Sequence, residues 1–128
     1  LQYNIMGLFN RDSNSSFSWG FLTELSKFNE AIELSANKPV LFFKHSTRCG
    51  ISTMVLRQFE LSWNTDLTCE LFLLDLLKNK ELSNQMAFYL QVIHQSPQVI
   101  LVINKNVIFH ASHHDIDTSH IEKHLLEL

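Results

Sequence analysis

The sequence predicts an α/β domain, with a mixed four-stranded β-sheet at its centre and helices on both faces. Short apolar runs alternate along the chain with segments whose apolar residues recur every three or four positions. Near the end, two further runs flank a short polar turn, which is typical of a β-hairpin. Strands separated by helices pair in parallel, and the hairpin adds antiparallel strands to the same sheet.

The first predicted helix covers residues 26–36, where Phe28 and Ile32 lie four positions apart on one face. Pro39 cannot continue this helix and favours extended backbone in the residue before it. The run PVLFF that follows is short and continuously apolar, as expected for a buried central strand.

The remaining elements follow from the same patterns. In chain order they are a helix over 50–62, a strand over 69–76, a helix over 79–93, a hairpin of 98–103 and 107–112 with its turn at 104–106, and a last helix from about residue 117. Residues 1–18 are expected to be a flexible lead-in, because 10–18 are rich in serine and asparagine. The predicted domain therefore covers residues 19–128.

Composition excludes several classes of function. The chain has 128 residues with 45% hydrophobic and 18% charged residues, which suits one globular domain. A net charge of −3 argues against broad electrostatic binding to nucleic acid, and no apolar run approaches the roughly 20 residues that span a membrane. Two cysteines are too few for a disulfide scaffold, and no secretory signal is evident, so we expect a cytoplasmic protein.

Candidate chemistry centres on the stretch FFKHSTRCGIS, in which Cys49 follows a strand and begins a helix. Unpaired N–H groups and the positive end of the helix dipole favour a thiolate at such a position. A thiolate there can attack a disulfide sulfur. Ser52 stands where a second cysteine would complete a dithiol, and its hydroxyl could donate a hydrogen bond to the thiolate. The neighbours expected to add positive charge, bind the substrate or keep the thiol open are Lys44, His45, Arg48 and Gly50.

The other half of the site is predicted in QSPQVIL. A Ser96–Pro97 bond directly before a buried strand is a suitable place for a cis peptide. A cis bond would leave the Ser96 backbone exposed beside Cys49, where an extended substrate could pair with it as an added strand.

These features resemble the thioredoxin fold. More narrowly, FFKHSTRCGIS, Ser96–Pro97 and the closing hairpin and helix resemble the monothiol bacilliredoxin-like family of the bacillithiol system. The resemblance implies that Cys49 attacks a mixed disulfide between a protein and bacillithiol, and carries this low-molecular-weight thiol until another thiol removes it. It also implies S-thiolated proteins as partners and bacillithiol as a co-substrate, with no tightly bound cofactor.

Two alternatives stay open. TRCGIS also resembles the RCGFS signature of monothiol glutaredoxins, which use glutathione and can share an iron–sulfur cluster; their glycine pair after the last strand is replaced here by HASHHD. The other alternative is a redox-inert domain that binds an extended peptide.

Two further sets of residues are interpreted as structural. Cys69 opens an apolar strand, and a free cysteine in such a run is usually buried. The C-terminal histidines do not form a metal-ligand pattern with cysteines or carboxylates, so no metal site is expected; they are His110, His113, His114, His120 and His124.

Overall fold

The computed structural model describes residues 18–128, so the expected flexible lead-in lies outside the described residues except for Ser18. The elements in chain order are β1 (Gly20–Phe21), α1 (Leu25–Leu34), β2 (Val40–His45), α2 (Gly50–Ser62), β3 (Glu70–Asp75), α3 (Lys80–Leu90), β4 (Gln98–Ile103), β5 (Asn106–Ser112), the 3-10 helix η1 (His113–Asp115) and α4 (Thr118–Leu126). Within this part of the chain, no helix is both long enough and apolar enough to cross a membrane.

The sheet is mixed, as predicted, but it has five strands rather than four. Its order is β1-β3-β2-β4-β5; β1, β3 and β2 are parallel, while β4 and β5 are antiparallel to their neighbours. The additional strand β1 pairs Gly20 with Phe72 and Phe21 with Leu73. Two residues are too few to show the alternation by which a strand is recognised in a sequence, which explains why β1 was missed.

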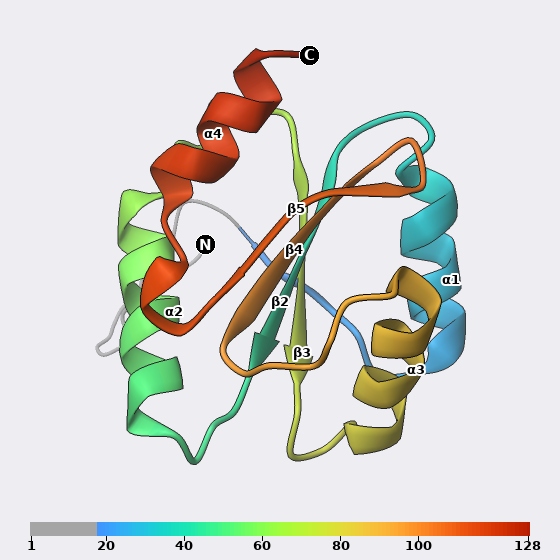
Figure 1. Ribbon diagram of the computed structural model, residues 1–128, viewed down its shortest axis with the longest axis vertical. Helices are drawn as coiled ribbons and strands as arrows, with labels where there is room; N and C mark the ends of the chain where they lie inside the picture. The colour runs from blue at the N-terminus through green and yellow to red at the C-terminus, as the bar shows by residue number, and fades with distance from the viewer. Residues whose placement is uncertain (1–17) are drawn as a thin grey trace.

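Helices cover both faces of the sheet, as predicted. Helices α1 and α3 lie on one side, and α2 and α4 on the other (Figure 1). A hydrophobic core lies on each face of the sheet, and alternate residues of β2 pack into one or the other, because successive side chains of a strand point to opposite faces. Phe42 packs with the α1 and α3 residues Phe28 and Met86, whereas Phe43 packs with Phe59 of α2 and Ile121 of α4.

Most predicted boundaries are close to the observed ones, and α2 has the predicted bounds. Helix α3 ends at Leu90, three residues earlier than predicted, because Gln91 adopts a left-handed conformation with φ of 56° and caps it. The predicted hairpin turn is confirmed: Asn104 and Lys105 both have positive φ, which matches the twist of the two strands.

Candidate functional site

Cys49 lies where the sequence predicts it, between strand β2 and helix α2. It is the N-cap residue of α2, with extended backbone (φ −103°, ψ 118°), and its thiol makes no capping hydrogen bond. The backbone of the loop is held instead by two bonds: Cys49 N–H donates to the Ser46 carbonyl (3.2 Å), and the Cys49 carbonyl accepts from Thr53 N–H (3.0 Å). The Cys49 side chain is therefore half-buried but not engaged as a cap.

His45 and Ser52 form a buried pair beneath this loop. His45 Nδ1 lies 2.7 Å from Ser52 Oγ, and Ser46 N–H donates to the same oxygen over 3.0 Å. Ser52 is completely buried and His45 is 7% exposed. The pair thus joins the last residue of β2 to the first turn of α2, on either side of Cys49.

The environment of His45 favours its neutral imidazole form. Burial lowers the pKa of His45, and the negative charge of Asp75, its neighbour on β3, opposes this only in part. Ser52 Oγ accepts from Ser46 N–H, and the tautomer of the neutral imidazole determines whether His45 Nδ1 accepts from the Ser52 hydroxyl or donates to it. The expected hydrogen bond from the Ser52 hydroxyl to the Cys49 thiolate remains a prediction; in this structure the hydroxyl lies within bonding distance of His45 Nδ1 and Ser46 N–H.

Lys44 points to the opposite face of the sheet from His45. Its side chain is completely buried, and Nζ lies 3.2 Å from the Ser83 carbonyl oxygen and 3.3 Å from His94 Nδ1. Burial lowers the pKa of Lys44 to about 8. The expectation that Lys44 contacts a thiol ligand is therefore not met: alternation along β2 turns its side chain into the interior beside α3.

The Ser96–Pro97 peptide bond is cis, as predicted. Pro97 directly precedes β4, whose residue Gln98 pairs with Lys44, so Pro97 lies beside the end of β2. The Pro97 carbonyl accepts a hydrogen bond from His113 N–H over 3.0 Å. The Ser96 hydroxyl oxygen is shielded from solvent and has no hydrogen-bond partner among the described residues. Buried hydroxyls are normally paired, so this oxygen is an exception to the rule in this part of the chain.

Arg48 and Gly50 flank Cys49 and are exposed. A Cβ atom placed on Gly50 would meet no atom within 4 Å, so the space beside the thiol is open on this side. Arg48 can contribute its positive charge from solvent. Their predicted roles in substrate binding remain predictions.

Cys69 lies one residue before β3 and packs partly against the core on the α2 side. Burial, together with the adjacent Glu70 carboxylate, raises the pKa of Cys69 to about 12. This environment keeps the Cys69 thiol protonated at neutral pH. It agrees with the structural role predicted for Cys69.

Three polar residues near the site were missed in the sequence. Ser83 on α3 and Gln98 on β4 are buried, and His94 is half-buried in the loop between these elements. Of these three residues only Gln98 offered a signal, because it stands at the head of the apolar run QVILVI. Ser83 and His94 acquire their contacts with Lys44 only through the packing of α3 on the sheet.

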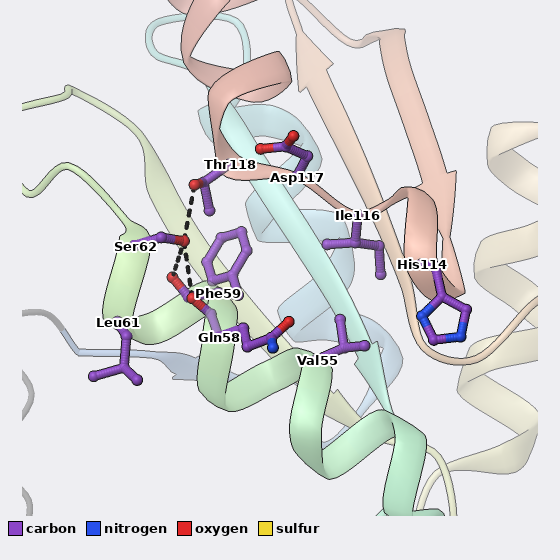
Figure 2. A pocket seen from close by; sticks show the side chains of 9 residues that line it. All are labelled: Val55, Gln58, Phe59, Leu61, Ser62, His114, Ile116, Asp117 and Thr118. Atoms are coloured by element: carbon purple, nitrogen blue, oxygen red, sulfur yellow. Dashed lines mark hydrogen bonds between the residues drawn. The ribbon is translucent and has the colours of Figure 1, made fainter.

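A separate pocket of about 440 Å³ lies between α2, η1 and the start of α4 (Figure 2). Val55, His114 and Ile116 line one part of it, and Ser62 and Thr118 meet at another, where the Thr118 hydroxyl donates to Ser62 Oγ over 2.9 Å. None of the predicted site residues lines this pocket. It belongs to the contact between α2 and α4 rather than to the surroundings of Cys49.

The C-terminal histidines do not form a metal-binding group. Within residues 18–128, no three or more histidine, cysteine or acidic side chains come together in an arrangement that could hold a metal ion. His120 and His124 instead pack their rings near Phe109 of β5, at centroid distances of 6.3 and 5.0 Å.

Comparison with known proteins agrees with this geometry. A thioredoxin-fold protein assigned as an oxidoreductase is 28% identical, with a TM-score of 0.71 over 81% of this chain and 90% of its own. The thioredoxin of Malassezia sympodialis is 14% identical (TM-score 0.67, covering 92% and 96%), and mitochondrial thioredoxin 3 of Saccharomyces cerevisiae 15% (0.66, covering 86% and 95%). These two likenesses concern the fold alone.

Residues 21–121 match the family model of the monothiol bacilliredoxin BrxC. The match includes Cys49, Ser52 and the Ser96–Pro97 bond, and it covers most of the chain. The resemblance seen in FFKHSTRCGIS is therefore confirmed, and the chain belongs to the monothiol bacilliredoxin family of thioredoxin-fold thiol oxidoreductases.

Proposed function

We propose that this protein removes bacillithiol from protein mixed disulfides, using Cys49 as its only nucleophile. One observation carries the proposal. Cys49 stands at the start of α2 with its thiol free of capping bonds, while the buried Ser52 occupies the place of a resolving cysteine. A site with one thiol can accept a small thiol from a disulfide but cannot release it by closing an internal disulfide.

The reaction consists of two thiol–disulfide exchanges. The Cys49 thiolate attacks the bacillithiol sulfur of a protein–bacillithiol disulfide, and the protein cysteine leaves as a thiolate that takes up a proton. Cys49 then carries bacillithiol in a mixed disulfide. A second low-molecular-weight thiol, as thiolate, attacks the bacillithiol sulfur, which releases the Cys49 thiolate and a small disulfide.

The surroundings of Cys49 suit a protein substrate. Gly50 leaves open space beside the thiol, and Arg48 presents a positive charge from the adjacent loop. The segment at Ser96 and Pro97 lies at the same edge of the sheet, where we propose that an extended stretch of the substrate pairs with the Ser96 backbone. We further propose a cytoplasmic setting, with S-thiolated proteins and bacillithiol as partners and neither nucleic acid nor membrane.

A defined substrate tests the proposal. A small protein with one cysteine, joined to bacillithiol or to glutathione, is incubated with this protein and free bacillithiol, and the released protein thiol is followed by intact mass. We expect catalysed release from the bacillithiol disulfide, abolished in Cys49→Ser and retained in Cys69→Ser. Release from the glutathione disulfide alone would favour glutaredoxin chemistry, and no release from either would favour a redox-inert peptide-binding domain.

The glutaredoxin reading predicts a further property. A glutathione-dependent cluster protein would give a coloured dimer after anaerobic reconstitution with iron, sulfide and glutathione. We expect a colourless protein, because HASHHD offers no glycine pair to hold glutathione and folds instead into the end of β5 and the short helix η1.

A further inference from the structure

Two buried polar side chains of the central strands lie on the face of the sheet that α1 and α3 cover. Lys44 of β2 and Gln98 of β4 are direct neighbours in the sheet and are 0% and 1% exposed. Further along the same face the positions are apolar, as at Phe42 and Ile100. Burying a lysine and an amide is costly unless both are well bonded, so their contacts indicate what they do.

Lys44 bonds to helix α3 and to the loop between α3 and β4. Its Nζ atom lies 3.2 Å from the carbonyl oxygen of Ser83, on α3, and 3.3 Å from Nδ1 of His94, in the loop. Ser83 Oγ lies 3.1 Å from the same His94 nitrogen. Lys44 thus ties the middle of the loop to the helix before it and to strand β2.

Gln98 bonds to the same loop from the neighbouring strand. Its Nε2 atom donates to the Ile93 carbonyl over 3.0 Å, and its Oε1 atom accepts from Gln95 N–H over 3.4 Å. Three consecutive loop residues, 93–95, are therefore bonded from inside the sheet. The next two residues are Ser96 and Pro97, at the edge where the Cys49 loop emerges.

We propose that Lys44 and Gln98 are positioning residues that hold the loop of residues 91–97 in place beside Cys49. Apolar side chains at both positions would fill the same space without the cost of burying polar groups, but would leave the loop without its inner bonds. The consequence for substrate binding rests on the proposed function: the fixed loop presents the Ser96 backbone to a protein substrate, whereas a small disulfide needs only Cys49.

Amide hydrogen exchange on the free protein tests the anchoring without any assay of activity. In Lys44→Met and Gln98→Met, we expect the amides of residues 91–96 to exchange about five- to tenfold faster, as the loss of about one hydrogen bond allows. The amides of α2 should be unaffected. Lys38→Met is the matched control, because Lys38 bonds to Glu70 (3.1 Å) near the opposite end of β2.

A pair of variants at His94 keeps the test decisive if Lys44→Met fails to fold. His94 is half-buried in the loop and tolerates change better than a strand residue. His94→Leu removes the acceptor for Lys44 and should loosen the loop, whereas His94→Asn can offer an oxygen near the place of Nδ1 and should restore its protection. Unchanged amide exchange of residues 91–96 in all these variants, or an equal acceleration of exchange along the whole chain, would overturn the proposal.

Kinetics then separate positioning from a general loss of stability. Lys44→Met and Gln98→Met should raise KM for a protein–bacillithiol disulfide about tenfold or less, with kcat and the rate toward small disulfides unchanged, since one or two weakened contacts are worth about that much. An equal loss of kcat/KM toward the protein–bacillithiol disulfide and toward small disulfides would contradict the positioning role. A wild-type protein with no activity would refute the proposed function, while the exchange result would still decide the anchoring.

Discussion

His45 Nδ1 lies 2.7 Å from Ser52 Oγ, and this bond fixes the end of strand β2 to the first turn of helix α2. The two residues enclose Cys49 in the sequence, and the same Ser52 oxygen also accepts from the Ser46 backbone. The serine that replaces a resolving cysteine is therefore an internal support of the loop. At the position where a dithiol site would hold its second sulfur, this site holds a hydroxyl whose hydrogen bonds fix the loop.

Ser52→Ala should lower the free energy of unfolding by about 1–3 kcal/mol, because it leaves His45 Nδ1 and Ser46 N–H buried without their shared partner. Urea unfolding monitored by circular dichroism measures this loss. Gln58→Ala is the control: Gln58 is exposed on the same helix and its side chain makes no hydrogen bond to the described residues, so a change within about 0.5 kcal/mol is expected. Equal effects of the two substitutions would show that the buried His45–Ser52 pair contributes no more to stability than an exposed polar side chain.

Ser52→Cys should convert the site from monothiol to dithiol. The introduced thiol would lie one helical turn from Cys49, so the mixed disulfide formed on Cys49 would be displaced by an internal disulfide. Intact mass after reaction with a small disulfide distinguishes the two products. Thr53→Cys is the matched control, since Thr53 is exposed on the adjacent position of α2. A persistent small-thiol adduct on Ser52→Cys would contradict this arrangement.

Alkylation should distinguish the two cysteines. At pH 8, a thiol whose pKa is about 12 is ionised in only about one molecule in ten thousand, so Cys69 should resist iodoacetamide in the folded protein. We expect a single adduct on Cys49, located by peptide mass mapping, and a second adduct only after unfolding in urea. Rapid modification of Cys69 in the folded state would show that its burial does not protect it.

Lys44 should make stability depend on pH in the alkaline range. Its pKa is about 8 in the folded protein against 10.5 for an ordinary lysine, so the unfolded chain binds more protons between these values. The free energy of unfolding should therefore rise from about pH 8 to pH 10.5, by about 3 kcal/mol at most, relative to Lys44→Met. Unfolding in urea at several pH values measures this difference. Lys38→Met should keep the wild-type slope, and parallel curves for wild type and Lys44→Met would contradict the prediction.

Much of the fold could be read from local patterns. The apolar run of β2, the periodicity of α2 and the polar turn of the hairpin each reflect forces between near neighbours in the chain. Strand β1 was not predicted, because its two residues are recognisable as a strand only through their pairing with Phe72 and Leu73. The early end of α3 depends on the left-handed conformation of Gln91, which sequence spacing alone did not indicate.

The candidate site was predictable in outline but not in its internal contacts. The place of Cys49 follows from a strand, a short loop and a helix start that are adjacent in sequence. The roles of Lys44 and His45 do not follow from the sequence, because these two neighbours point to opposite faces of the sheet. Lys44 contacts residues 39 and 50 positions away, and His45 contacts a residue 7 positions away. Only the assembled sheet shows that both are buried supports rather than exposed contacts for a ligand.

Intact-mass analysis of the purified protein after exposure to bacillithiol disulfide, with glutathione disulfide in a parallel sample, tests the central claim most directly. We predict one adduct of bacillithiol mass, mapped to Cys49, absent from Cys49→Ser and present in Cys69→Ser, with little or no glutathione adduct under the same conditions. An adduct on Cys69, an adduct with glutathione alone, or no adduct with either disulfide would contradict the proposal that Cys49 carries bacillithiol.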